Sequence, residues 1–219
     1  MTTLRSNYGK YTKSSEARLV AMRDCLLAIE REQLAGDIVE CGVWRGGNII
    51  LARKLAPGRT CWLFDTFAGM TEPTLHDRKP NGFLALESFR KKTTDGRAWA
   101  AASVDEVRSY LAETGTLDDE RLRFVVGPVE RTLLSAQLPD HISLLRLDTD
   151  WHASTKVELE VLFPRLVPGG YLIVDDFGHW LGARRAVNDY FEGRPNSTPI
   201  DDTAILIRKK FGSGVDTLT

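Results

Sequence analysis

Cysteine is scarce in this chain of 219 residues, and its three copies, Cys25, Cys41 and Cys61, lie far apart. Their spacing fits neither a disulfide framework nor a zinc site. Long hydrophobic runs are also missing, since no stretch approaches the roughly 20 apolar residues that span a bilayer. The polar stretch 1–19 lacks the apolar core of a signal peptide. We therefore expect a cytoplasmic protein with reduced thiols that does not act at a membrane.

An excess of charge of one sign is absent as well. The 29 basic and 30 acidic residues leave a formal net charge of −1, and no basic tract stands out. This balance excludes a general electrostatic attraction to nucleic acid or to acidic membranes, so we expect a small-molecule partner. The length suffices for one domain with a sizeable core. We interpret residues 1–219 as a single domain whose first 14 residues are flexible.

Apolar runs and helical periodicities alternate along the chain. An amphipathic helix, with apolar residues spaced at about 3.6, begins after Ser15. Strands are predicted at 37–43, 60–65, 121–127, 141–148, 169–176 and 203–209. Because these runs are apolar throughout, they favour a doubly wound, mostly parallel α/β sheet with helices on both faces. The stretch 66–103 is longer than a simple connection and predicts a lid inserted between the second and third strands.

A turn rich in glycine follows the first predicted strand. The strand ends at Glu40, and Gly42, Trp44 and Gly46 lie in the turn that opens the next helix. Small residues at such a place let a ligand approach the N-terminus of the helix. The spacing is not that of the dinucleotide fingerprint, G-x-G-x-x-G. A tight strand-to-helix connection without a ligand is the alternative interpretation of this turn.

An acid ends the second predicted strand. Asp65 stands there, directly before Thr66, and an acid at this position can accept hydrogen bonds from both hydroxyls of a ribose. The alternative is an aspartate that caps the following turn. Together, the glycine turn and Asp65 predict a nucleoside cofactor.

Two pairs of acids end the fourth and fifth predicted strands. Asp148 and Asp150 follow one apolar run, and Asp175 and Asp176 follow the next. In a doubly wound sheet these strand ends share the edge where ligands bind. Crowded carboxylates repel one another unless a cation lies between them, so Asp148, Asp175 and Asp176 predict a site for Mg²⁺ or another hard divalent cation. Asp150 then becomes the candidate general base. The alternative is that some of these acids cap helices.

Two histidines lie close to these acids in the sequence. His179 follows the second pair and His152 follows the first, and either could serve as the base in place of Asp150. Trp44, Trp151 and Trp180 also lie next to strand ends, where they either line a pocket or pack in the core. We keep His179 as the second catalytic candidate.

Four blocks of the sequence resemble the macrocin O-methyltransferase family (the TylF type): VECGVWRGG, LFDTFAGM, LRLDTDWHAST and PRLVPGGYLIVDDFGHWLGARRAV. The resemblance runs from Ala35 to Tyr190. Its members are class I enzymes with a Rossmann-like fold that use S-adenosylmethionine, mostly to methylate sugar hydroxyls of antibiotics and related natural products. The chain departs from the family pattern after the third strand, where Pro128 follows Gly127 in place of an acid.

The resemblance implies a role for each candidate residue. It implies that S-adenosylmethionine lies over the GVWRGG turn, with Asp65 on its ribose, and that an acid matching Asp150 is the base. It implies Mg²⁺ on Asp148, Asp175 and Asp176. The expected cofactor-binding residues are Glu40, Gly42, Trp44, Gly46, Asp65, Thr66 and Asp148.

The expected function is therefore metal-dependent O-methylation of a small molecule, with a glycosylated natural product as the acceptor. A catechol or phenol acceptor stays open, because the sequence has no sugar-specific motif. A metal-dependent hydrolase or phosphatase, and a nucleoside-binding module without turnover, are the rival functions. Family habit and the apolar stripe of the N-terminal helix predict a homodimer.

Overall fold

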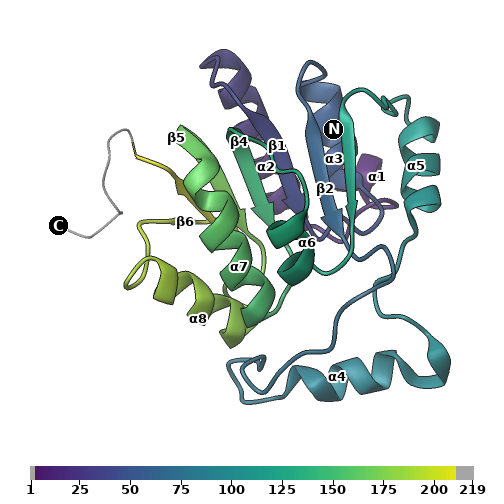
Figure 1. Ribbon diagram of the computed structural model, residues 1–219, viewed down its shortest axis with the longest axis vertical. Helices are drawn as coiled ribbons and strands as arrows, with labels where there is room; N and C mark the ends of the chain where they lie inside the picture. The colour runs from purple at the N-terminus through teal and green to yellow at the C-terminus, as the bar shows by residue number, and fades with distance from the viewer. Residues whose placement is uncertain (1–2, 211–219) are drawn as a thin grey trace.

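The computed structural model describes residues 3–210, which form a seven-stranded sheet with helices on both sides (Figure 1). The strands are β1 (Asp37–Cys41), β2 (Cys61–Asp65), β3 (Leu122–Val126), β4 (Ile142–Leu147), β5 (Leu166–Val174), β6 (Thr198–Pro199) and β7 (Ile205–Arg208). The α-helices are α1 (Leu4–Tyr8), α2 (Glu16–Arg31), α3 (Gly47–Leu55), α4 (Ala85–Lys92), α5 (Val104–Glu113), α6 (Val129–Ser135), α7 (His152–Leu162) and α8 (Leu181–Tyr190). Two short 3₁₀ turns are η1 (Thr94–Gly96) and η2 (Phe163–Arg165).

The predicted α/β fold is confirmed. The strand order is β3-β2-β1-β4-β5-β7-β6, and β1 to β5 pair in parallel, whereas β7 pairs antiparallel with β5 and β6. Successive residues of β1 point to opposite faces, so Ile38 joins one apolar core and Val39 joins the other. Two helix layers therefore bury the central strands β1, β2, β4 and β5 on both faces, which explains why these strands are mostly apolar.

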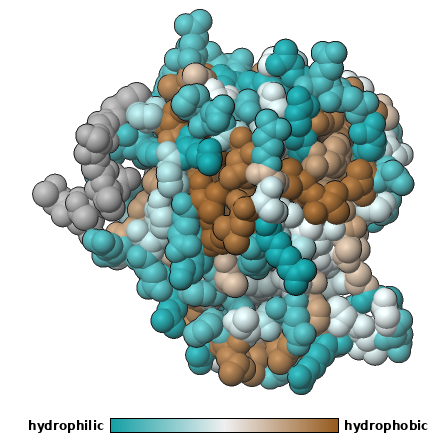
Figure 2. All heavy atoms as spheres, viewed as in Figure 1, coloured by the Kyte–Doolittle hydropathy of each residue, from teal (hydrophilic) through white to brown (hydrophobic). Residues whose placement is uncertain are grey.

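Each face of the sheet carries its own helix layer (Figure 1). The core with Ile38 includes residues of α2, α3 and α5, and the core with Val39 includes residues of α6, α7 and α8. Figure 2 shows a largely hydrophilic surface with hydrophobic residues gathered in the middle of the visible face. Among residues 3–210, no helix is both long enough and apolar enough to cross a membrane.

The chain reverses its direction of winding between β1 and β4. From β1 it builds β2 and β3 to one side, and it then returns to place β4 and β5 on the other. At such a switch point the connections leave in opposite directions and open a crevice beyond the carboxyl ends of the strands. The fold therefore places the turn after β1 beside the residues that follow β4.

Residues 3–14, which belong to the stretch 1–14 predicted to be flexible, contain helix α1 and contact the rest of the domain. Residues 1–2 lie outside the described part, but α1 has an N-cap at Thr3, whose hydroxyl accepts a hydrogen bond from the backbone of Ser6. Tyr11 and Thr12 are buried, and the Gly47 N–H donates to the Tyr11 carbonyl over 3.0 Å. Residues 3–14 thus pack against the N-terminus of α3 as part of the domain.

The stretch 66–103, which sequence analysis predicted as a lid, contains α4 and η1. In Figure 1, α4 lies apart from the sheet, beyond the carboxyl ends of the strands. Fully buried Asp77 fastens the stretch, because its side chain accepts a hydrogen bond from the His152 N–H at 2.8 Å, at the start of α7. The Trp151 indole N–H donates a hydrogen bond to the Thr71 carbonyl at 3.0 Å, which is a second contact between the stretch 66–103 and the start of α7.

Candidate active site

A cavity of about 320 Å³ lies at the carboxyl ends of β1, β2, β4 and β5. Its wall combines the segment 12–14, the turn between β1 and α3, parts of the stretch 66–103 and the loop after β3. These segments are far apart in the sequence and meet only at this edge. The cavity is therefore the place where a doubly wound sheet binds its ligand.

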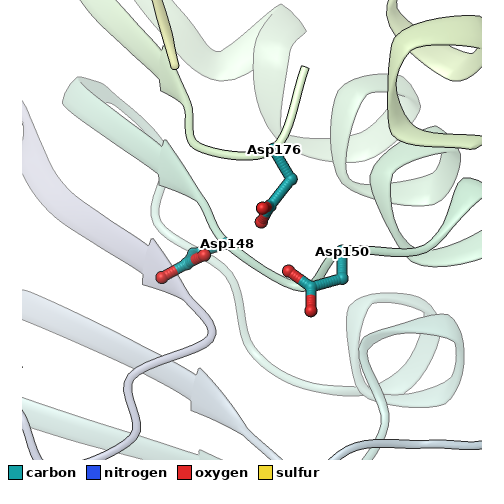
Figure 3. Close-up of side chains that lie close together, drawn as sticks. All are labelled: Asp148, Asp150 and Asp176. Carbon is teal, nitrogen blue, oxygen red and sulfur yellow. The ribbon is translucent and has the colours of Figure 1, made fainter. Parts of the chain in front are cut away.

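Three carboxylates face a common space inside this cavity (Figure 3). Asp148 and Asp150 follow β4, Asp176 follows β5, and one oxygen of each lies within 4.8 Å of the others. Asp176 Oδ2 is buried and has no hydrogen-bond partner. Asp150 has a φ of +70°, a left-handed backbone that aspartate tolerates better than most residues. Hard oxygen donors and an unpaired buried oxygen fit a divalent cation such as Mg²⁺.

The crowding of these carboxylates changes their protonation. Desolvation raises the pKa of Asp150 to about 6. A hydrogen bond with Asp176 acts against this shift, and the charge of Asp148 adds to it. Desolvation and the charge of Asp150 also raise the pKa of Asp176. The pKa of Asp148 is raised by desolvation even though Arg146 acts against it. A cation between the three groups would relieve this repulsion.

Asp175 has a different environment from the one that sequence analysis predicted. Its side chain pairs with Arg146 at 2.5 Å and with Arg18, and it does not belong to the group of three carboxylates. The register explains this: Arg146 pairs with Ile173, so Asp175, two residues further along, points to the same face of the sheet as Arg146. The structure thus gathers Asp148, Asp150 and Asp176 rather than the predicted set of Asp148, Asp175 and Asp176.

Arg146 is a buried centre of charge that sequence analysis missed. Its side chain is 2% exposed and lies near the carboxyl end of β4. Nη1 donates to Glu40 and Asp148 at 2.8 and 2.9 Å, and Nη2 donates to Asp175 and to the Ser14 hydroxyl at 2.5 and 3.2 Å. One signal was available in the sequence, because an arginine inside the apolar run LLRL requires buried acids around it.

The glycine turn reaches the acids through a close backbone contact. Gly42 has a φ of +86°, and a Cβ atom there would lie 2.0 Å from the Asp148 carbonyl oxygen. Asp65 holds the same turn from the other side, because its Oδ2 accepts hydrogen bonds from the N–H groups of Val43 and Trp44 at 2.7 and 3.0 Å. Asp65 therefore shapes the turn whether or not it also binds a ribose, which stays a prediction.

The predicted cofactor-binding residues divide into two groups. Gly42, Trp44, Asp65, Thr66 and Asp148 line the cavity. Glu40 and Gly46 do not line the cavity. Glu40 is fully buried and accepts hydrogen bonds from Asn48 and Arg146. Desolvation raises its pKa to about 7. The loop where Pro128 replaces the family's acid also contributes to the wall, through Gly127, Pro128, Val129 and Glu130.

The histidines lie outside the cavity wall. The ring of His179 packs on Trp180 at 4.7 Å between centroids, and the ring of His152 lies 5.2 Å from that of His76. Desolvation lowers the pKa of both His152 and His179, so both are neutral near pH 7. Trp44 lines the cavity, whereas Trp151 and Trp180 pack together beneath the stretch 66–103. Asp150 therefore lines the cavity, whereas His179 does not.

Solved structures with a similar fold identify the class of protein. The chain superposes on the structure of the O-methyltransferase NovP with a TM-score of 0.77, at 29% identity over 92% of this chain and 83% of that one. A doubly wound sheet with its cavity at the switch point, and this likeness, define an S-adenosylmethionine-dependent O-methyltransferase.

The family follows from the sequence comparisons. Residues 8–209 match the family described as Macrocin-O-methyltransferase (TylF), and the chain belongs to this family. It is 33% identical, over 90% of its length and 74% of the relative's, to the 8-demethyl-8-(2,3-dimethoxy-alpha-L-rhamnosyl)-tetracenomycin-C 4'-O-methyltransferase of Streptomyces olivaceus. It is 30% identical, over 82% of its length and 70% of the relative's, to the mycinamicin III 3''-O-methyltransferase of Micromonospora griseorubida. The enzyme class and the resemblance stated above are thereby confirmed.

Proposed function

We propose that this enzyme depends on Mg²⁺ and methylates a sugar hydroxyl of a glycosylated natural product. The observation that carries the proposal is the convergence of Asp148, Asp150 and Asp176 within 4.8 Å inside the cavity. These three acids would hold the cation, which when bound orients a hydroxyl and eases the loss of its proton. Asp175 is left out of the ligand set, since its carboxylate is already paired with two arginines.

The side chains of the enzyme would then divide the remaining tasks. Asp150 would bind the cation through one carboxylate oxygen and take the proton of the acceptor hydroxyl with the other, because its side chain lines the cavity on the loop between β4 and α7. Gly42 and Asp65 hold the turn against which the cofactor would lie. Holding both reactants in one cavity replaces a bimolecular encounter and supplies much of the acceleration. Parts of the stretch 66–103 line this cavity and would shield the bound reactants from water.

The two curated relatives support the choice of acceptor. The name of one relative specifies a rhamnosyl-bearing tetracenomycin, and the name of the other specifies a mycinamicin. A homodimer stays a prediction, and its original basis is weaker, because the apolar stripe of α2 is buried in the core of its own chain through Leu19, Met22 and Leu26. A size measurement in solution will decide the oligomeric state.

The proposal is tested by binding and by turnover. S-adenosylhomocysteine should bind in isothermal titration, and methyl transfer to rhamnosylated antibiotics should stop with EDTA and return with Mg²⁺. Full activity in EDTA would refute the metal dependence. Turnover of catechols but not of glycosides would refute the acceptor and favour the phenolic alternative.

The role of Asp150 is tested by Asp150→Asn. This change should keep S-adenosylhomocysteine affinity and lower kcat by about 10² to 10⁴, the contribution of a general base. Asp189→Asn, at an exposed aspartate on α8, is the matched control and should keep full activity. If Asp150→Asn stays active while His179→Ala is inactive, the base is His179 instead.

A further inference from the structure

A second, shallow hollow opens beside the active-site cavity. Its wall consists of Lys13, Ala98 and Ala100 together with Lys91, Lys92, Arg97 and Trp99. Lys13, Lys92, Trp99 and Ala100 line both spaces, so the hollow and the cavity are continuous. A ligand that fills the cavity therefore reaches four cationic side chains at its outer end, and no acid lies among the residues that line this hollow.

Three of these cations form no ion pair with a carboxylate in the described part of the chain. Among residues 3–210, no acid lies within 4.0 Å of the ammonium group of Lys13, Lys91 or Lys92, and Arg97 has only an exposed contact with Asp95 at 3.8 Å. Lys13 and Lys92 lie instead over tryptophan rings, at 4.7 Å from the centroid of Trp44 and 3.9 Å from that of Trp99. Aromatic faces hold a cation in place without neutralising its charge.

The lysines also repel one another. Desolvation and the charge of Lys92 lower the pKa of Lys13, although the charges of Asp150 and Asp148 oppose them. Desolvation lowers the pKa of Lys92, although the charge of Asp150 opposes it. Grouping like charges is unfavourable unless an anion enters between them. A single carboxylate would balance one of the four cations, whereas a diphosphate carries several negative charges and several acceptor oxygens.

We propose that this hollow binds a phosphate or diphosphate group of the acceptor. The proposal rests on the proposed function, because it assigns a chemical group of the molecule whose hydroxyl is methylated. Lys13 and Lys92 border both spaces, so the anionic group lies next to the end of the acceptor that enters the group of three carboxylates. The methylated sugar would then reach this enzyme as a phosphate ester or as a nucleoside diphosphate sugar, before its attachment to the natural product. This acceptor replaces the finished glycoside of the proposed function and keeps its sugar hydroxyl.

The test uses inorganic pyrophosphate as the probe. Isothermal titration is run with saturating S-adenosylhomocysteine and EDTA, so that pyrophosphate cannot bind through Mg²⁺. Binding to the unaltered enzyme should weaken as salt is raised. It should weaken about tenfold or more in Lys91→Gln/Lys92→Gln, which loses two charge-assisted contacts. The matched control, Lys54→Gln/Lys156→Gln, removes two lysines outside both spaces and should bind pyrophosphate like the unaltered enzyme.

The arms of the experiment separate the possible sources of the group. Thymidine diphosphate that binds more tightly than pyrophosphate supports a nucleotide sugar, and equal affinity supports another phosphorylated acceptor. Absence of pyrophosphate binding, equal binding by the Lys91→Gln/Lys92→Gln variant, or equally tight binding of glucuronate would overturn the proposal. If that variant loses S-adenosylhomocysteine affinity instead, the lysines bind the cofactor and the proposal fails. Loss of S-adenosylhomocysteine binding in the unaltered enzyme would refute the proposed function separately.

Discussion

Replacing Arg146 by methionine should be the most damaging change near the active site. Methionine keeps much of the volume of the side chain but removes the cation that Glu40, Asp148 and Asp175 share. The side chains of Glu40 and Asp175 are 1% and 5% exposed, so water cannot replace Arg146 at either carboxylate. A buried charge that loses its partner typically costs about 3 to 5 kcal/mol.

Two remaining contacts and the exposure of one side chain to water reduce this cost. Arg18 still pairs with Asp175, Asn48 still donates to Glu40 at 2.8 Å, and the side chain of Asp148 is 30% exposed and partly screened by water. We therefore expect the lower end of the range, a loss of about 3 kcal/mol in the free energy of unfolding. Arg185→Met, at an exposed arginine paired with Asp189, should cost less than about 1 kcal/mol.

The assay is urea unfolding of both variants between pH 5 and pH 8. Without Arg146 the pKa values of Glu40 and Asp148 in the folded protein rise further above their unfolded values, and stability from such groups is lost as pH rises. The difference between Arg146→Met and the unaltered enzyme should therefore be largest at pH 8 and shrink toward pH 5. Adding Glu40→Gln should recover part of the loss, because it removes one of the unpaired charges. A loss below about 1 kcal/mol at pH 8, or one that is independent of pH, would refute the reasoning.

Three further predictions concern single residues. Desolvation raises the pKa of Glu158 in the folded protein to about 8, above its value of 4.5 in the unfolded chain. The stability that the protonated side chain contributes is therefore fully present below pH 4.5 and is lost as the pH rises through 8. Glu158→Gln should flatten the fall in unfolding free energy over that range, and parallel curves for the two proteins would contradict this. Gly42→Ala should lower stability by about 1 to 3 kcal/mol, because its Cβ would meet the Asp148 carbonyl, whereas Gly58→Ala, with open space around it, should be neutral in thermal melting. Asp176→Asn should weaken Mg²⁺ binding at least tenfold by titration, whereas Asp175→Asn should keep it; the reverse result would restore Asp175 as a ligand.

The order of helices and strands could be predicted because it depends on local pattern. Apolar runs predicted β1 to β5 and β7, with differences of a few residues at their ends, and the 3.6-residue period after Ser15 predicted α2. Helix α1 was missed because its five residues are too short to show a period. The edge strand β6 was missed because two residues carry no alternation.

The sequence by itself determined that four acids would meet at one edge of the sheet, since parallel strands bring their carboxyl ends together. It did not determine which carboxylates face one another. That depends on the pairing of Arg146 with Ile173, which directs Asp175 to the arginines, and on the left-handed backbone of Asp150, which places its side chain beside Asp176. Both are consequences of strand register and loop conformation, which arise from contacts between segments distant in the chain. The same contacts bring Lys13 to Lys92, a pair that no local pattern connects.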